Sequence, residues 1–292
     1  MGELLTTTGQ YDQALEYLDQ SLALAVERGD HDAQARACRW SARAYESRGE
    51  YALALEWGQR GLDANSVEAA ELSLIAGLIH TRQGDYDSAL ERCQYAMRLA
   101  QRSREAAVLA RSSNLIGHIT RLRGQITASI QHFRHAYDMY QRAGDLPGQA
   151  TSYNLIANAL ADIGQWREAD DHYRQARQIF DQIGDVYNRA FTDNNLGEIR
   201  LKRGELEDAL ASYRAALQTM EQIGGSRYVL GVMHMNLGAT FVRRGEIDTA
   251  RAHLRTSQEH FEQVQARDWL PELHCHCAEA ELHAGEPSKA KA

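Results

Sequence analysis

The chain has 292 residues, of which 43% are hydrophobic and 25% are charged, and its formal net charge is −8. This composition predicts a folded protein with a core rather than a disordered chain. It argues against a general nucleic-acid binder, which usually carries excess positive charge. No apolar run approaches the roughly 20 residues of a membrane span, and the first residues lack the pattern of a secretory signal. The four cysteines show neither disulfide nor zinc spacing, so we expect reduced thiols in a cytoplasmic protein.

A hexad of glycine, a polar residue, a bulky residue, two variable residues and a small residue recurs along the chain. In chain order it begins at Gly9, Gly49, Gly84, Gly124, Gly164, Gly204, Gly245 and Gly285. The spacings between these glycines are 40, 35, 40, 40, 40, 41 and 40 residues. Eight copies in phase indicate a repeat architecture, in which each unit buries its apolar face against its neighbours.

Each interval between hexads is predicted to hold two helices. In the stretch 145–163, Tyr153, Ile156 and Leu160 follow an i, i+3, i+7 spacing that places them on one helical face. A second stretch with the same periodicity follows the next hexad glycine. That glycine suits the left-handed turn that ends a helix, and Gly-Asp pairs such as Gly184-Asp185 suit the end of one helix and the cap of the next. The sequence therefore predicts an all-α fold of stacked antiparallel helical hairpins.

Small and large residues also recur at fixed places around the hexad glycine. One example combines the small Gly197, Ala209 and Ala216 with the large Leu196 and Tyr213. This pattern resembles the tetratricopeptide repeat over essentially the whole chain. It departs from that family in its period of about 40 rather than about 34 residues, and in its Gly-Asp signal where the family has a helix-ending proline.

Long-period repeats of this kind resemble those of kinesin light chain, the Pins-type polarity proteins and bacterial signal-transduction ATPases of the maltose-activator kind. The resemblance implies a single right-handed superhelical solenoid over residues 1–292, with about seven to eight repeats.

The register of the repeats leads us to expect a fragment of a larger protein. Gly2 falls in the middle of the first helix of its repeat, and the last repeat stops barely one turn into its second helix, within 287–292. Natural solenoids end in polar capping elements. We therefore expect uncapped ends that could associate head to tail.

The resemblance further implies that the first helix of each repeat lines a concave channel. Asn114, Asn154 and Asn194 occupy the same channel position in three consecutive repeats. Asparagine is unfavourable inside a helix because its amide competes for backbone hydrogen bonds, so this repetition needs a reason. One interpretation is a ladder of amides that grips the main chain of an extended peptide. The other is that the amides tie neighbouring helices together or simply tolerate solvent.

Basic residues contribute a second feature of the predicted channel. They are Arg36, Arg39, Arg43, Arg111 and Arg121, and they would favour an acidic segment, a carboxylate or a phosphate. The alternative is that these arginines pair with Glu46 and Glu71. No lysine falls in the channel, so the lysine-containing clamp for chaperone tails known in this family is not supported.

Other channel residues complete the predicted binding surface. The remaining candidates are His118, Asn158, Phe191 and Glu198, of which Phe191 could stack on a ring. In the repeat of Gly245, the same positions fall on Val232, Met235, Ala239 and Val242.

Residues at metal-binding or catalytic spacing are scarce. In the run His274-Cys275-His276-Cys277, only His274 and Cys277 share a helical face, so we expect no metal site and no cofactor. Neither a phosphate-binding glycine loop nor a nucleophile motif is present, and we expect no enzymatic activity.

The sequence thus favours a protein- or peptide-binding scaffold whose channel holds an extended or acidic segment. Within that class, it suggests the sensing or docking arm of a larger signalling regulator. Two alternatives stay open: a sensor of a sugar or another metabolite in a transcriptional regulator, and a structural self-assembly scaffold. The expected partner is a protein or peptide, and neither nucleic acid nor a membrane.

Overall fold

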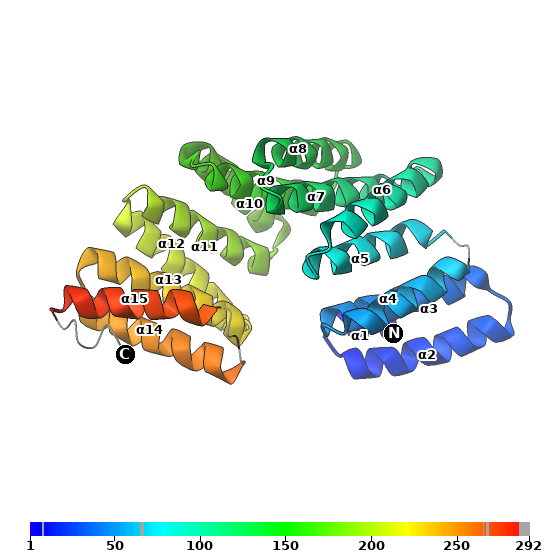
Figure 1. Ribbon diagram of the computed structural model, residues 1–292, viewed down its shortest axis with the longest axis horizontal. Coiled ribbons are helices and arrows are strands. Elements are labelled where there is room, and N and C mark those ends of the chain that lie inside the picture. The colour runs from blue at the N-terminus through cyan, green and yellow to red at the C-terminus, as the bar shows by residue number, and fades with distance from the viewer. Residues whose placement is uncertain (8, 65–66, 265, 267–268, 286–292) are drawn as a thin grey trace. The chain divides into compact units, whose positions relative to one another are not determined.

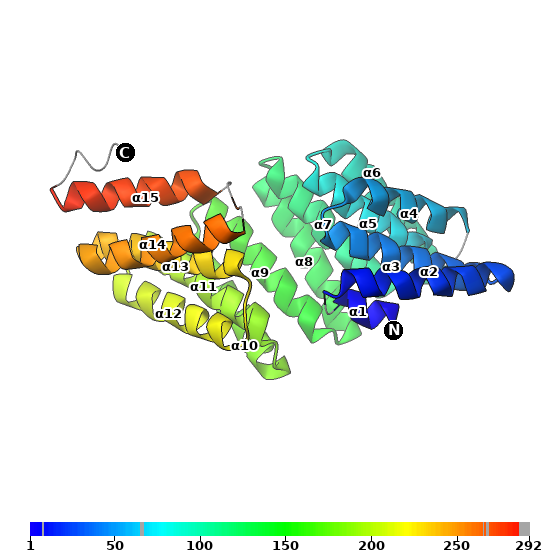
Figure 2. The same cartoon turned by 90° about the horizontal axis from the view of Figure 1, so that it is seen from below.

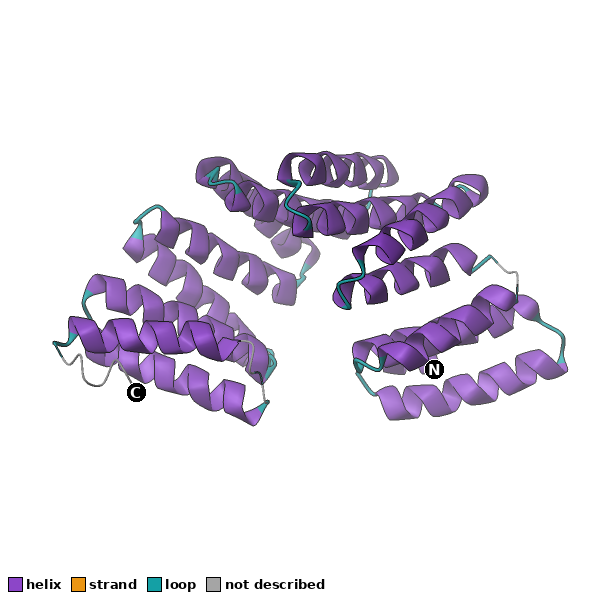
Figure 3. Cartoon of the chain, viewed as in Figure 1, coloured by secondary structure: helices purple, strands orange, loops and turns teal. Residues whose placement is uncertain are grey.

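The protein is described from a computed structural model, which covers residues 1–7, 9–64, 67–264, 266 and 269–285 (Figure 1). Over these residues the regular structure is helical and contains no strand, which confirms the all-α prediction (Figure 3). The chain divides into two compact units, Met1–Ser152 and Tyr153–Ala292. The division falls inside one helix, α9 (Leu146–Asp162).

Unit 1 is built from helical hairpins that follow one another along the chain. Its helices are α1 (Gly2–Thr7), α2 (Tyr11–Glu27), α3 (His31–Ser47), α4 (Tyr51–Asp63), α5 (Ala69–Arg82), α6 (Tyr86–Ser103), α7 (Ala106–Leu122) and α8 (Ile126–Ala143), followed by the start of α9. Helices adjacent in sequence pack together, and the first helices α1, α3, α5 and α7 also contact one another in turn. The first helices therefore form one layer and the second helices another.

Unit 2 repeats this arrangement (Figure 2). After the end of α9 it contains α10 (Trp166–Ile183), α11 (Val186–Lys202), α12 (Leu206–Gln222), α13 (Arg227–Arg244), α14 (Ile247–Gln263) and α15 (Leu270–His283). Here α11 pairs with α12 and α13 with α14, while α11 contacts α13 and α13 contacts α15. Within each unit, the predicted stacking of hairpins is confirmed.

The hexad glycines end the first helices in the predicted way. All eight have a positive φ, for example 74° at Gly164 and 79° at Gly204. At the junction of α10 and α11, Gly184 takes the left-handed conformation, and the Asp185 carboxylate accepts a hydrogen bond of 3.0 Å from the backbone N–H of Asn188. In the Gly-Asp pair, the glycine therefore ends α10 and the aspartate caps the N-terminus of α11.

Glycines at a second position let the two helices of a hairpin approach closely. A Cβ atom built on Gly117 would lie 2.6 Å from the ring of Phe133, and one on Gly197 would lie 2.7 Å from the ring of Tyr213. Such distances are far below van der Waals contact. The aromatic side chains of the second helices thus occupy the space that these glycines leave open.

The 35-residue spacing of the second repeat comes from two short helices. Helix α4 has 13 residues and α5 has 14, whereas the other first and second helices of the complete hairpins have 17 or 18. Gly58 in α4 leaves open space, since a Cβ atom at this position would meet nothing within 4 Å. The predicted start of a second helix in the last repeat, within 287–292, lies outside the described residues.

Candidate ligand-binding cleft

Two of the in-phase asparagines make the same contact with the following repeat. The Nδ2 of Asn114 donates to the Oγ of Ser152 over 3.5 Å, and the Nδ2 of Asn154 donates to the Oγ1 of Thr192 over 3.0 Å. In both cases the hydroxyl lies 38 residues further along the chain. We call this contact the asparagine tie, because it joins the first helices of consecutive repeats.

The third asparagine is also bonded to a neighbouring helix. The Oδ1 of Asn194 accepts a hydrogen bond of 3.0 Å from the Nδ2 of Asn236. Asn114 and Asn194 are buried, and Asn154 is half-buried. These bonds favour the interpretation in which the amides tie neighbouring helices together.

One buried hydroxyl shows what happens where the tie is missing. Ser112 occupies the position of Ser152 and Thr192 one repeat earlier, and it is fully buried. The residue 38 positions before it is Leu74 rather than asparagine. The Ser112 Oγ accordingly has no hydrogen-bond partner among the described residues.

Four of the arginines that were predicted to form a basic channel make ion pairs with glutamate side chains. Arg36 and Arg39 lie 3.4 and 3.1 Å from the carboxylate oxygens of Glu68, and Arg39 also lies over the ring of Trp40. The remaining pairs are Arg43 with Glu46 at 4.0 Å and Arg111 with Glu71. The four arginines thus share three carboxylates, and Glu46 also pairs with Arg82 at 2.7 Å, so these contacts favour the ion-pair interpretation although positive charge remains in excess.

Three other predicted residues, His118, Arg121 and Asn158, do not line the cleft of unit 2 that is described below. His118 is half-buried, and burial together with the nearby Arg121 lowers its pKa. Asn158 accepts a hydrogen bond of 2.5 Å from the hydroxyl of Tyr173 on the second helix of its own hairpin.

Unit 2 contains a cleft of about 530 Å³ between α11, α13 and the beginning of α15. Three predicted residues line it, namely Phe191, Asn194 and Glu198. Its apolar lining is supplied by Leu201, Val229, Val232, Met233 and Ala239. The stripe predicted for α11 therefore does face a ligand-sized space.

The sequence prediction missed two lining residues of α13. Asn236 and Arg243 line the cleft, and they follow Asn194 and Leu201 by 42 residues, one more than the 41-residue spacing of the hexad glycines. The residues that the hexad register places in the channel, Met235 and Val242, are buried instead. Because Val232 and Ala239 do line the cleft in that register, the spacing of the glycines does not identify the two missed positions.

Aromatic side chains form one end of this cleft. The Nε1 of Trp269 donates a hydrogen bond of 2.5 Å to the hydroxyl of Tyr228, and the two rings are 6.4 Å apart at 72°. Trp269 is also stacked on Phe261, with ring centroids 6.5 Å apart. Trp269 precedes α15 outside any repeat position, and no pattern in the sequence marks it as a cleft residue.

Two of the charged side chains of the cleft form an ion pair with each other. Glu198 pairs with Lys202 at 2.6 Å, and Glu272 lies 4.0 Å from His276. Arg243 is exposed and makes no ion pair with any described residue. It is thus the free cation of the cleft within the part of the chain that the structure describes.

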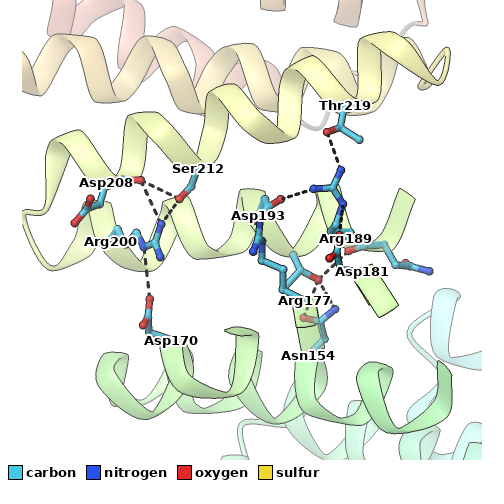
Figure 4. A network of polar contacts seen from close by, with 12 residues as sticks. Asn154, Asp170, Arg177, Asp181, Arg189, Asp193, Arg200, Asp208, Ser212 and Thr219 are labelled. Carbon is cyan, nitrogen blue, oxygen red and sulfur yellow. Dashed lines mark hydrogen bonds and ion pairs between the residues drawn. The ribbon is translucent and has the colours of Figure 1, made fainter. Parts of the chain in front are cut away.

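A polar network supports α11 on the face turned away from the cleft (Figure 4). Arg177 on α10 donates a hydrogen bond of 2.5 Å to the buried Asp193 of α11, and Arg200 lies 3.6 Å from the buried Asp170 of α10. Burial raises the pKa of Asp193, although Arg177 opposes this shift. Arg200 also donates a hydrogen bond to the Oγ of Ser212 on α12, so these contacts join α10, α11 and α12 and hold the cleft wall in place.

Three histidines gather on the other side of α13. The Nδ1 atoms of His234 and His253 are 2.9 Å apart, and the rings of His234 and His260 are stacked at 5.8 Å. Burial, followed by the two neighbouring imidazoles, lowers the pKa of His234 to about 4. This cluster is therefore uncharged at neutral pH.

Metal-ligand clusters and membrane-spanning helices are both missing from the described residues. No group of three or more histidine, cysteine, aspartate or glutamate side chains among them is arranged to hold a metal ion. None of the helices in the described ranges is long and apolar enough to cross a membrane.

The stacked hairpins, with their alternating first and second helices, define a helical repeat protein. The sequence model of the tetratricopeptide repeat matches residues 1–65, 68–142, 108–182 and 188–263. The chain belongs to the tetratricopeptide repeat family, as its sequence pattern predicts. Domains of this family are generally protein-binding scaffolds and are usually non-catalytic.

Solved structures share this fold at low sequence identity. The kinesin-light-chain-like BtubC from P. vanneervenii has a TM-score of 0.61 and 17% identity, over 85% of this chain and 92% of that one. A Rap protein complexed with competence and sporulation factor has a TM-score of 0.70 and 13% identity, over 97% and 77%. At these identities the likeness concerns the fold.

A third structure is a signal transduction ATPase with numerous domains from Pyrococcus horikoshii, which carries a tetratricopeptide repeat sensor. Its TM-score is 0.72 and its identity 12%, over 93% of this chain and 43% of that one. No curated protein matches the chain in sequence.

Proposed function

We propose that the chain is a peptide-binding module and that the cleft of unit 2 is its site. The observation that carries this proposal is the cleft of about 530 Å³, with an apolar lining and a few polar groups at its edges. Ligand sites in proteins typically have this size and composition. Asn195 adds an amide that makes no side-chain hydrogen bond with the described residues, so it is available to a ligand main chain.

The shape of the lining favours an extended peptide. The cleft residues of α11 run from Phe191 to Lys202, a distance of about 16 Å at a rise of about 1.5 Å per residue. An extended chain advances about 3.3 Å per residue, so roughly five residues fit along this wall. Since the polar network holds α11 in place, binding costs little rearrangement.

Relatives of the same fold suggest a regulatory setting. One solved neighbour is a Rap protein bound to a peptide factor, and another is the sensor region of a signal transduction ATPase. By analogy with these proteins, we propose that this chain is the sensing or docking arm of a larger signalling regulator.

A displayed library of random peptides, selected against the full chain, tests this function. Selected peptides are titrated calorimetrically against the chain and against Val232→Arg, which places a long charged side chain in the cleft. Val264→Arg is the matched control, because Val264 is exposed and lies outside the cleft. We expect Val232→Arg to weaken binding at least tenfold and Val264→Arg to leave it unchanged. Equal binding by both variants, or no selected peptide at all, would refute the proposal.

A small metabolite is the second candidate ligand, because the cleft volume also suits a drug-sized molecule. A thermal-shift screen with sugars and other metabolites tests it on the same three proteins. A shift that Val232→Arg abolishes, in the absence of any peptide binding, would favour the metabolite.

A further inference from the structure

The two ends of the cleft differ in chemistry. Phe191 and Tyr228 are 42% and 39% exposed, and both lie near the N-terminal ends of their helices. Phe191 is backed by Tyr187, with ring centroids 6.1 Å apart. Tyr228 is held by its hydrogen bond from Trp269. These contacts hold Phe191, Tyr228 and Trp269 in place at one end of the cleft. An aromatic ring of a ligand can make edge or face contacts with them.

The opposite end carries Arg243, which has no ion pair with any residue in the described ranges. This residue lies in the last turn of α13, whereas its neighbour Arg244 is engaged by Glu207 and Glu246. A guanidinium binds a carboxylate through two parallel N–H···O bonds, which gives both energy and orientation. Arg243 can offer this fork to a ligand, because the other cation of the cleft, Lys202, is already paired with Glu198.

The aromatic end of the cleft disfavours an acidic group. Glu272 lines the cleft and lies in the first turn of α15, three residues after Trp269. Glu198, the other acidic lining residue, is paired with Lys202 on its own helix. A ligand carboxylate brought next to Glu272 would be repelled by its like charge.

From these three observations, we infer that the cleft selects a peptide with an aromatic or bulky apolar side chain at one end and a carboxylate at the other. Tyr228 and Arg243 are 15 residues apart on α13, which corresponds to about 22 Å. An extended peptide of about five to seven residues spans this distance once the reach of the arginine side chain is included. The inference rests on the proposed peptide-binding function and adds the chemistry of its ligand.

Four pools of N-acetylated hexapeptides, of which the first three are C-terminal amides, test the inference on the full chain. The first carries tryptophan at one end and glutamate at the other, in either order, around four randomised neutral residues. The second replaces glutamate with glutamine, and the third places glutamate next to tryptophan. The fourth has no glutamate and ends in a free carboxylate, which separates a C-terminal carboxylate from a side-chain one. Retention on the immobilised chain is measured by mass spectrometry.

We expect the first or the fourth pool to be retained at least tenfold better than the second and third. Arg243→Gln should abolish this preference while leaving the second pool unchanged, and Trp269→Ala should reduce retention of all four. Arg167→Gln is the matched control, because Arg167 is exposed in unit 2 and lies outside the cleft.

The two possible failures are distinguishable. Equal retention of the acidic and neutral pools, or a preference that survives Arg243→Gln, overturns the inference and leaves peptide binding intact. If no pool is retained and the displayed library also yields no binder, the proposed function itself fails.

Discussion

Replacing Ser112 with alanine should stabilise the protein, although most substitutions in a core do the opposite. The Ser112 hydroxyl is fully buried and has no hydrogen-bond partner within the described part of the chain. Burial of an unsatisfied hydroxyl costs about 1–3 kcal/mol. Alanine keeps the Cβ atom and removes only this group, and it also has a higher helix propensity than serine. We therefore expect Ser112→Ala to raise the free energy of unfolding by about 1 kcal/mol.

Ser152→Ala is the matched control, because Ser152 occupies the same repeat position in the same unit and is equally buried. Its hydroxyl accepts the bond from Asn114, so alanine there leaves a buried amide without its partner. This change should lower the free energy of unfolding by about 0.5–1.5 kcal/mol.

Urea unfolding of the full chain, followed by circular dichroism, measures both variants. Because both residues lie in unit 1, they report on the same cooperative transition even if the two units unfold separately. A loss of stability in Ser112→Ala equal to that in Ser152→Ala would show that the Ser112 hydroxyl is satisfied, and the reasoning from the missing tie would then be wrong.

Glycine contacts, a histidine cluster and a buried carboxylate lead to three other predictions. Gly58→Ala should stabilise the chain by about 0.5–1 kcal/mol, because a Cβ meets open space in a helix. Gly197→Ala should destabilise it by about 1–3 kcal/mol through overlap with a tyrosine ring, and thermal melts compare the two. The lowered pKa of His234, about 4, means that the unfolded chain takes up a proton first as the pH falls. Stability should therefore decrease between pH 6.5 and 4 and be unaffected by this group above pH 6.5; His234→Phe should show a smaller decrease, and an unchanged profile contradicts the assignment. Arg82→Met removes the nearer of the two cations of the buried Glu46, at 2.7 Å, and should cost about 1 kcal/mol in urea unfolding, more than the same change at an arginine whose partner carboxylate is exposed, such as Arg123 with Asp87.

The fold could be predicted from the sequence because its determinants are local and repeated. Each hexad glycine marks a turn that needs a positive φ, and the structure has a positive φ at all eight. The helical periodicity of the apolar residues predicts the helices, and small residues such as Gly197 predict where the two helices of a hairpin come into contact. The division into two units could not be predicted from the sequence, because it falls within α9 and no loop or change of pattern marks it.

The candidate site could be predicted only in part, because it depends on contacts between repeats. Phe191, Asn194 and Glu198 line the cleft as their stripe on α11 suggests. The pairing of Arg36 and Arg39 with one shared carboxylate depends on distances across 29 to 32 residues of chain, which a repeat pattern does not encode. For the same reason, the sequence shows that the asparagines recur, but it does not show that the amides of Asn114 and Asn154 are hydrogen-bonded to hydroxyl groups of the next repeat.

The asparagine tie has a consequence for how such a protein can change in length. Its donor sits on one first helix and its acceptor on the next, at a constant offset of 38 residues. A duplicated hairpin that keeps this offset would arrive with an acceptor for the copy before it and a donor for the copy after it. Tandem duplication or deletion of a hairpin that carries both groups therefore preserves its ties, whereas an insertion of one or two residues between donor and acceptor changes the offset on which the tie depends.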